Sequence, residues 1–485
     1  MMTPTLPGTL ASVLMQVVAP LSAPSPGSGA SPPASAKADP SLPKAPSTAS
    51  LLASAATRDR PVLALDAAEH SAIEHQPNIR QARFATAAAV GRVEQARSPY
   101  LPQVVGNASW IYGNEASAHG SSTGTSTGTT GTTMSTTTAT SSASGASGTT
   151  GSTYTAQLSA TQLIYDFGQT TEKWKAADRT VEGLQATEAV TRNQIVYNVR
   201  SAFFTAREDR ALVRVQMETL QNEQKHLVQT EGFVNAGTQP EISLAQTRTD
   251  LANAKVQLIQ AENNYDIARA QLNLAMGVTA SVDYDVADEG IRGVDGEDDS
   301  AEQLINRALS ARPELASLVK QHEADVLTIR GLQGGYAPTI SGLGGAGFFG
   351  GDIATLTPAW QVGLTLSWPI FLGGLTRGQV REAQGNLGVV DSQLEAERLQ
   401  VRLDVEQARL SVRSAKVSIG ATEEALINAR EQLRLAEASY SQGVGNIIQL
   451  GDAQVAVTSA GAQRVQADFN LAIARAQLLL ALGRP

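Results

Sequence analysis

The most regular pattern of hydrophobic and polar positions runs from Val401 to Ala481. Small and apolar side chains recur there at alternating steps of four and three residues, and polar side chains flank them. This is the spacing of the a and d positions of a coiled coil. The breaker Gly-Val-Gly-Asn at 443–446 divides the pattern into two arms. We therefore expect two long helices that fold back on each other and need neighbours to cover their other faces. The positions of this seam are Val401, Val405, Ala408, Val412, Ala415, Ile419, Thr422, Leu426, Ala429, Leu433, Ala436 and Tyr440 in the first arm, and Leu450, Ala453, Val457, Ala460, Arg464, Ala467, Leu471, Ala474, Leu478 and Ala481 in the second.

The hairpin pattern occurs twice, because an internal duplication runs through the chain. Three pairs of glycines share a separation of 206 residues (374 − 168 = 206): Gly168 and Gly374, Gly237 and Gly443, Gly277 and Gly483. Upstream, Tyr100 and Pro102 correspond to Tyr336 and Pro338 at the longer separation of 236 residues (336 − 100 = 236). The difference places an insertion in the first repeat. It falls in a tract of Ser, Thr and Gly at about 113–153, which predicts a flexible loop.

The repeats set the expected domain organisation. Residues 61–277 form the first structural repeat and residues 301–485 the second. The segment between them, 278–300, is crowded with Asp and Glu and is interpreted as a solvated acidic linker. A calcium-binding loop is the alternative, but the spacing lacks the D-x-[DN]-x-[DN]-G pattern.

Residues 1–60 are rich in Ala, Ser and Pro and cannot build a core. Within them, Leu10–Ala23 forms a short apolar run that ends in small residues, which predicts an export signal (signal peptide). A disordered tail is the alternative interpretation.

Each repeat is expected to contain a helix, two strands separated by a loop, and then the long hairpin. The helices are expected at 66–97 and 301–332, and the Gly-rich run at 344–351 is expected at the tip of the strand pair. The second strand of the second repeat alternates strictly, with Trp360, Val362, Leu364, Leu366 and Trp368 on one face. Its counterpart, 154–162, is only partly apolar.

The two tryptophans, Trp360 and Trp368, are eight residues apart, which corresponds to about 27 Å along a strand. That length is close to the height of the apolar band of an outer-membrane protein, which aromatic girdles flank. The same alternation would fit a half-buried strand of a soluble sandwich. However, the strands occur as one pair per repeat within an otherwise helical chain.

Four strands cannot close a barrel. If they span a membrane, several chains must share one barrel, because an open sheet would leave unpaired backbone groups in lipid. The helix that begins near Thr376 and ends near Gly443 would reach roughly 90 to 100 Å, far more than a compact domain. Both features predict an oligomer.

Composition and charge exclude several classes of function. The net charge is −9 and no long basic run is present, which argues against nucleic acid as a partner. The chain has no Cys, and its five His are scattered, so neither thiolate chemistry nor a metal site is expected. Neither a G-x-x-x-x-G-K-[ST] loop nor an H-E-x-x-H motif occurs. We expect neither an enzyme nor a cofactor.

From about Pro61 to Pro485 the sequence resembles the TolC-like outer-membrane efflux protein family. The resemblance rests on the duplicated order of the elements and on short motifs: Trp368-Pro369-Ile370-Phe371-Leu372-Gly373-Gly374, its counterpart Leu163-Ile164-Tyr165-Asp166-Phe167-Gly168, the turn Tyr440-Ser441-Gln442-Gly443-Val444-Gly445-Asn446, and Asp452-Ala453-Gln454. Each motif alone is weak, whereas their duplicated order is specific.

The resemblance implies a mainly α fold with a β-barrel portion. A duplicated unit of helix, β-hairpin and long helical hairpin would form a homotrimer with a shared 12-stranded outer-membrane barrel and a periplasmic α-helical tunnel. It implies a passive exit duct of a tripartite efflux or type I secretion system. The partners would be a periplasmic adaptor, an inner-membrane pump of the RND, ABC or a similar class, and outer-membrane lipid. The expected location is the outer membrane of a Gram-negative cell, with an extension into the periplasm.

The resemblance also implies functional positions. The two helical turns would meet the adaptor through Gly237, Thr238, Gly443 and Val444. Asp452 would lie at the tunnel's aperture, where three-fold symmetry makes a ring of carboxylates, and Gln449 occupies a position that is acidic in some members. A favourable charge in the first turn of a helix is the alternative reading of Asp452.

The membrane girdle would include the aromatic residues Trp110, Tyr154, Trp360 and Trp368. A periplasmic adaptor, which also uses long helical hairpins, is the alternative function. An adaptor would carry one hairpin between β domains, whereas this chain carries two hairpins and no extended β-rich segment.

Overall fold

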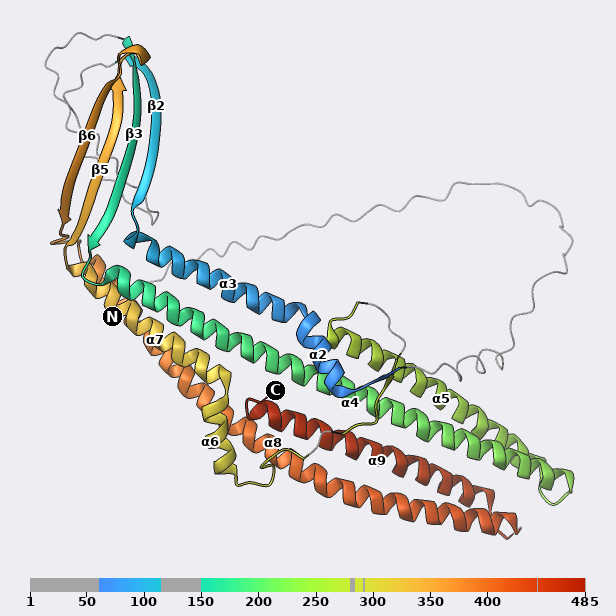
Figure 1. Ribbon diagram of the computed structural model, residues 1–485. Helices are drawn as coiled ribbons and strands as arrows, with labels where there is room; N and C mark the ends of the chain where they lie inside the picture. The colour runs from blue at the N-terminus through green and yellow to red at the C-terminus, as the bar shows by residue number, and fades with distance from the viewer. Residues whose placement is uncertain (1–60, 115–149, 280–283, 291–292, 443, 485) are drawn as a thin grey trace, which may run out of the picture. The chain divides into compact units, whose positions relative to one another are not determined.

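The same order of elements runs twice through the chain (Figure 1). It comprises α2 (Leu65–His75), α3 (Pro77–Arg97), β2 (Gln103–Asn114), β3 (Thr150–Tyr165), α4 (Gln169–Asn235) and α5 (Glu241–Met276), and then α6 (Ala301–Ala311), α7 (Pro313–Gln333), β5 (Thr339–Gly350), β6 (Thr357–Ser367), α8 (Leu375–Ser441) and α9 (Ile447–Ala481). The short elements are β1 (Val62–Leu63), β4 (Asp285–Val286) and the 3₁₀ turns η1 (Ser98–Tyr100), η2 (Gly334–Tyr336) and η3 (Ile353–Thr355).

The computed structural model describes residues 61–114, 150–279, 284–290, 293–442 and 444–484. These residues lie in one compact unit, Arg60–Pro485. The predicted export signal, most of the predicted loop at 113–153, and Gly443 lie outside the described residues. Within the described part of the chain, no helix combines the length and the apolar character that crossing a membrane requires.

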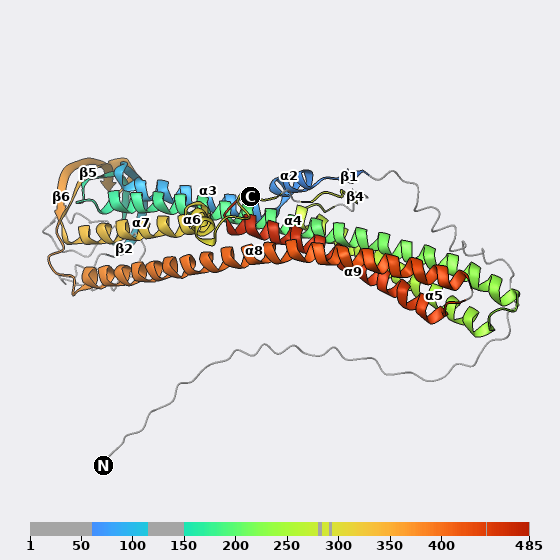
Figure 2. The ribbon, with the colours of Figure 1, turned by 90° about the horizontal axis from the view of Figure 1, so that it is seen from below.

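The two predicted long hairpins are confirmed. α4 packs along α5, and α8 packs along α9, as Figures 1 and 2 both show. α4 and α8 contain 67 residues each, about 100 Å of helix. Most of the seam is buried as expected, with Val401, Val405 and Leu478 fully covered. α4 also packs against α9, so the two hairpins lie side by side.

The two single helices expected at 66–97 and 301–332 are wrong, because each is broken before a proline. α2 ends at His75, and the next residue, Gln76, is extended (ψ 122°) before Pro77. α6 ends at Ala311, and Arg312 is likewise extended (ψ 124°) before Pro313. The residue before proline is pushed toward extended backbone, and proline itself cannot donate a helical hydrogen bond.

At each break, the residue before the proline donates side-chain hydrogen bonds to the end of a hairpin helix. The side-chain amide of Gln76 donates to the carbonyls of Leu274 (3.0 Å) and Ala275 (2.7 Å) at the end of α5. At the corresponding place in the second repeat, Nε of Arg312 donates to the carbonyl of Ala481 (2.8 Å) at the end of α9. Each proline break therefore satisfies carbonyls that the end of a helix leaves unpaired.

The strands form one four-stranded antiparallel sheet in the order β2-β3-β5-β6. Residues paired across it share a face, because neighbouring side chains along a strand point to opposite sides. The even-numbered face is chiefly apolar, with Val104, Ala108, Trp110, Tyr154, Ala156, Leu158, Ala346, Phe348, Trp360, Val362, Leu364 and Leu366. The odd-numbered face is chiefly polar, with Asn107, Ser109, Thr155, Gln157, Ser159, Thr161, Ser341, Gln361 and Thr365.

The expected position of the Gly-rich run is wrong. Residues 344–350 lie within β5, where 344–349 pair with both β3 and β6 and Gly350 pairs with β3. Gly347 is pressed against β3, since a Cβ there would lie 2.6 Å from the carbonyl oxygen of Ala156. The glycines therefore allow close approach of strands, and the connection between β5 and β6 begins after Gly350.

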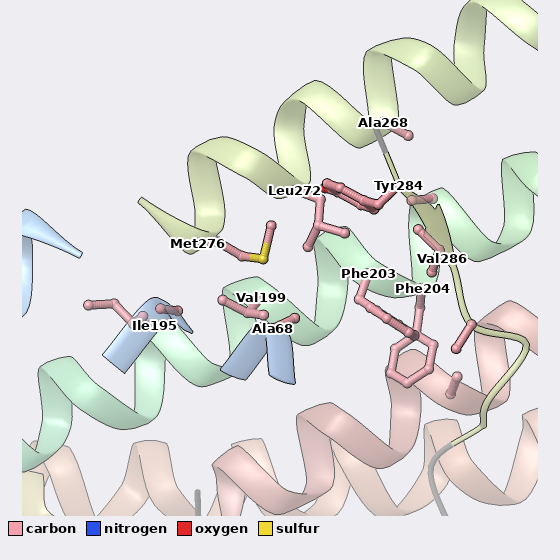
Figure 3. Packing of buried hydrophobic residues seen from close by; sticks show 14 of the residues in the cluster. Ala68, Ile195, Val199, Phe203, Phe204, Ala268, Leu272, Met276, Tyr284 and Val286 are labelled. Carbon is pink, nitrogen blue, oxygen red and sulfur yellow. The ribbon is translucent and has the colours of Figure 1, made fainter. Parts of the chain in front are cut away.

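The main core joins the first hairpin to the segment that links the repeats. Phe203 and Phe204 of α4, Leu272 and Met276 of α5, and Val286 of β4 meet there (Figure 3). β4 pairs in parallel with β1, so Val286 lies beside Leu63. The described residues of the linker are therefore anchored by buried apolar side chains.

The expectation of a solvated acidic linker holds for Asp288, Glu289, Asp295 and Asp298, which are exposed, and is wrong for Glu297, whose side chain is largely covered. Glu297 contacts Arg475 (3.0 Å) and Lys416 (2.8 Å), and Asp288 contacts Arg207 (2.8 Å). Burial opposes ionisation of Glu297, but hydrogen bonds from Arg475 and Lys416 outweigh it and lower its pKa to about 2. Glu297 and Asp288 thus pair with helices of the two hairpins, and nothing in the linker sequence itself predicts these contacts.

Candidate functional site

The turn between α4 and α5 is closed by a glycine in the left-handed region. Gly237 has φ 71°, which costs glycine little and other residues more. The amides of Gly237 and Thr238 donate to the carbonyls of Val234 and Phe233, each at 3.0 Å. The hydroxyl of Thr238 also donates to Phe233 at 2.9 Å. Two of the predicted docking residues, Gly237 and Thr238, therefore build the turn itself and lie exposed at its tip.

The turn between α8 and α9 is tight for a different reason. The amides of Val444 and Gly445 both donate to the carbonyl of Ser439, at 3.2 and 2.9 Å. A Cβ on Gly445 would lie 2.7 Å from the backbone nitrogen of Tyr440, so a larger residue does not fit. Asn446 caps α9 by accepting a hydrogen bond from the amide of Ile448 (3.1 Å). Val444 is left 81% exposed at the tip.

A buried tyrosine joins the two turns. The Tyr440 side chain is 1% exposed, and its hydroxyl donates to Oε1 of Gln239 (3.0 Å) and lies 3.2 Å from the hydroxyl of Thr230. Its ring packs edge-on against His226 and Phe233. Burial lowers the pKa of His226. This cluster ties the end of one hairpin to the end of the other.

Asp452 lies in a groove between the N-terminal halves of α5 and α9. The groove has a volume of about 760 Å³ and is floored by α4. Its polar lining comprises Thr219, Glu223, Ser243, Gln246, Asp250, Asn253, Gln257, Asp452, Gln454, Thr458 and Ser459. Asp452 is exposed, whereas Gln449, also exposed, lies outside the groove. Of the two predicted aperture residues, only Asp452 lines the groove, and a further carboxylate, Asp250 of α5, lines it as well.

Glu223 lies at the floor of this groove and is unusual for a carboxylate. Its side chain is 7% exposed, and its Oε2 atom is buried without a hydrogen-bond partner. Burial, and then the negative charge of Asp250, raise its pKa to about 7. Glu223 also lines a neighbouring cavity of about 370 Å³ between α4, α8 and α9, where burial raises the pKa of Glu208 to about 7 as well.

The predicted girdle residues lie on the apolar face of the sheet or next to its end. Trp110 of β2 and Tyr154 of β3 are partners in register, and their rings stack with centroids 6.4 Å apart. Trp360 of β6 is 80% exposed on the same face. Trp368 follows β6 directly, and its indole donates to the carbonyl of Tyr336 at 3.2 Å.

Some features of the site were missed by the sequence interpretation. Tyr165, Phe167, Tyr336, Ile370 and Phe371 are exposed where the sheet meets the helices, next to Trp368. Their signal is a group of aromatic and apolar residues at strand ends. Asp250 was also missed, because nothing in the sequence of its own helix indicates that it lines the groove. Only the tertiary structure shows that Asp250 lines the same groove as Asp452.

Known proteins share both the sequence pattern and the fold of this chain. The pattern that defines the outer membrane efflux protein family matches residues 69–278 and 304–484. Outer membrane protein TolC of Escherichia coli (strain K12) is 25% identical over 443 residues, which cover 84% of this chain and 79% of that protein.

Solved structures share the fold. The CmeC outer membrane channel of Campylobacter jejuni has a TM-score of 0.73 at 15% identity, over 86% of this chain and 85% of that one. The outer membrane protein VceC of Vibrio cholerae has a TM-score of 0.71 at 17% identity, over 87% of this chain and 96% of that one.

Proposed function

We propose that this chain, which belongs to the outer membrane efflux protein family, works as a homotrimer with one shared 12-stranded barrel and one helical tunnel. It is an outer-membrane exit duct that extends into the periplasm. Family membership favours the duct over the alternative of a periplasmic adaptor. The family is one of transport ducts rather than enzymes. The observation that carries the proposal is the sheet, which has an open edge on either side within the described residues.

The edges of the sheet support the trimer. β2 and β6 each pair on one side only among the described residues, and β6 exposes Trp360, Val362, Leu364 and Leu366. An open sheet edge in lipid would leave its amides and carbonyls unpaired, at a cost of several kcal/mol for each group. Pairing of β6 with β2 of a sister chain removes both edges. Three copies of four strands then close one barrel.

The helices support the same assembly. α8 exposes an apolar stripe made of Leu399, Leu403, Leu410 and Val417, spaced by four and seven residues. α5 exposes Val256, Ile259, Ile267 and Leu274. Each stripe keeps helical spacing, as an interface to another helix would. α5 and α8 are the outer members of the row α5-α4-α9-α8, so contact between α8 and the α5 of a sister chain would close a ring.

We further propose the division into repeats at 61–277 and 301–485, joined by 278–300 and preceded by an export segment at 1–60. α4 and α8 begin 206 residues apart, at Gln169 and Leu375, and both begin after a glycine with φ near 90°. The repeat explains how one chain supplies two neighbouring wall segments.

The exposed aromatic residues are proposed to lie at the boundaries of the lipid layer. Trp110, Tyr154 and Trp360 would form one girdle on the apolar face of the sheet, and Trp368 would belong to the other. Aromatic side chains with a polar edge favour such boundaries. The apolar face between them would then contact the hydrocarbon.

The two turns are proposed as the docking site for a periplasmic adaptor, which would connect the duct to an inner-membrane pump in a tripartite efflux or type I secretion system. Gly237, Thr238, Gly443 and Val444 would form this surface. Val444 presents an apolar side chain to solvent at the tip, as a contact residue would. Asp452 would form a ring of carboxylates just inside the aperture, with Gln449 as its neutral neighbour.

The trimer is tested by native mass spectrometry of the purified protein in detergent. Ile427 of α8 is 61% exposed, and Ile427→Glu would place a charge in the helix interface and lower the trimer fraction. Asn428→Glu, at the next and also exposed position, is the matched control and should remain trimeric. A monomeric wild-type protein would overturn the proposal.

A photo-crosslinking amino acid at Val444 tests the docking site. We expect capture of an adaptor with this probe and not with the same probe at the exposed residue Glu424 of α8, 17 residues before the end of that helix (441 − 424 = 17). Equal capture at both positions would remove the turn from the interface.

A further inference from the structure

Four helices meet the sheet at one end, because α3 and α7 end there and α4 and α8 begin there (Figures 1 and 2). Contacts between neighbours place these ends at one level. Cζ of Arg97, the last residue of α3, lies 5.5 Å from the ring centroid of Trp174 in α4. α4 packs along α7, and a Cβ on Gly335, just after α7, would lie 3.5 Å from Cγ2 of Thr376 in α8. We call the two turns of each helix nearest the sheet, about 12 Å of helix, the basal layer; it comprises 90–97, 169–176, 326–333 and 375–382.

Basic residues outnumber acidic ones in the basal layer, although the whole chain has a net charge of −9. The layer contains seven basic residues, all of them exposed: Arg92, Arg97, Lys173, Lys175, Arg330, Arg377 and Arg381. Its acidic residues are Glu94, Glu172 and Glu382. The excess is therefore four positive charges in each chain (7 − 3 = 4). The basal layer thus carries the opposite charge to the rest of the chain.

Most of these positive charges have no carboxylate partner among the described residues. Lys175 pairs with Glu172 of its own helix (2.9 Å), and the other basic side chains of the layer form no ion pair within the described part of the chain. Asp166 lies just before α4, but it is buried. Its oxygens accept hydrogen bonds from the amides of Gly168 (3.2 Å) and Thr170 (2.6 Å). The basal layer therefore presents a positive surface to its surroundings.

The basal layer continues an exposed apolar surface. Ile370 and Phe371 lie between β6 and α8, and Tyr165, Phe167 and Tyr336 lie at the same junction of sheet and helices; all five are exposed. Apolar and aromatic side chains followed by basic ones match the order of a bilayer, in which hydrocarbon gives way to phosphate groups. Long Arg and Lys side chains can reach such phosphates while their apolar neighbours stay in the lipid.

We propose that the basal layer binds the headgroups of anionic phospholipids in the leaflet that faces the periplasm. This inference rests on the proposed contact of the sheet with lipid, and it names the class of lipid. A guanidinium group can donate two parallel hydrogen bonds to a phosphate, and each basic group near an anionic surface adds to the attraction. Zwitterionic headgroups carry a compensating positive charge and bind less well.

The test is native mass spectrometry of the purified protein in detergent with equal amounts of phosphatidylglycerol and phosphatidylcholine. We expect the wild type to retain phosphatidylglycerol in about tenfold preference, and the preference to fall in about 0.5 M ammonium acetate, because salt screens exposed charges. The double variant Arg377→Gln and Arg381→Gln should lower the preference by roughly threefold or more, since it removes two of the positive charges.

Arg398 and Arg402 provide a matched control. They are also exposed and also four residues apart on α8, but they lie 21 residues further from the sheet (398 − 377 = 21), about 30 Å along the helix. The double variant Arg398→Gln and Arg402→Gln makes the same change in net charge and should leave the lipid preference unchanged. An equal loss of preference in both double variants would overturn the proposal, as would equal retention of the two lipids by the wild type.

A second measurement separates the surface from the pore. If Arg377 and Arg381 line the pore instead, their replacement shifts the reversal potential in a salt gradient and leaves the lipid preference unchanged, a result that would overturn the proposal. All basic residues of the layer belong to one chain, so the preference can be measured on any oligomeric state. A monomer that prefers phosphatidylglycerol would overturn the trimer and keep the lipid site, whereas a trimer that retains both lipids equally would overturn only the lipid site.

Discussion

The hydroxyl of Tyr440 donates to Oε1 of Gln239 across 3.0 Å, although the two residues lie 201 positions apart. The bond joins the last turn of α8 to the loop between α4 and α5. Because Tyr440 is buried, this contact and the nearby Thr230 hydroxyl satisfy its polar atom away from water. The ends of the two hairpins therefore separate only if this bond breaks.

Replacement of Tyr440 by Phe should loosen the ends of the hairpins. The variant keeps the ring and loses the hydrogen bond, so we expect a loss of about 1 kcal/mol in stability and a larger open fraction of the pore. Single-channel recording measures the open fraction. Tyr265→Phe is the control, since the Tyr265 hydroxyl donates to Asp285 (3.1 Å), outside the turns, and should not change opening. Equal opening of both variants would contradict a specific role for Tyr440.

Glu223 should make the fold less stable as the pH rises. Its pKa is about 7 in the folded protein, against an ordinary value of 4.5, so the folded state binds the proton more tightly. Stability from this group is fully present below about pH 4.5 and is lost as the pH rises to about 7. The full effect is about 3 kcal/mol per chain.

Melting temperatures of the wild type and Glu223→Gln between pH 5 and pH 8 test this expectation. The difference between the two proteins should grow in favour of the variant as the pH rises. The lowered pKa of His226 acts in both proteins and cancels in the difference. Parallel curves would show that Glu223 titrates in its ordinary range.

Gly445 should tolerate no larger residue. Gly445→Ala would press a methyl group against the backbone of Tyr440 at 2.7 Å, so we expect a lower melting temperature and a disturbed turn. Gly232, a helical residue near the other turn, has open space around it. Gly232→Ala should therefore stabilise α4 by roughly 0.5 to 1 kcal/mol. Similar melting temperatures for the two variants would contradict the close contact at Gly445.

Glu297 should hold the segment between the repeats. Glu297→Gln removes the charge that pairs with Arg475 and Lys416, and we expect faster proteolytic cleavage within 284–300. Because the pKa of Glu297 is lowered to about 2, its contribution is fully present above about pH 4.5 and is lost as the pH falls toward about 2. Asp295→Asn, at an exposed position, should leave the cleavage rate unchanged.

The sequence alone determined the long hairpins, because a seam at steps of four and three residues constrains helices through local periodicity. It also determined the duplication, the alternating strand at Trp360, and the resemblance to efflux ducts. It did not predict that the helices break before Pro77 and Pro313, although a proline is a common helix-breaking residue.

Only the tertiary structure decided which distant residues meet. The linker carboxylates read as solvated because ion pairs with Arg475 or Arg207 leave no mark in the linker itself. The strand register decided that the even-numbered positions share one apolar face. In the same way, only the packing of α5 and α9 places Asp250 in the same groove as Asp452, which belongs to the other repeat. Such contacts depend on packing between elements, whereas periodicity reports only on the face of a single element.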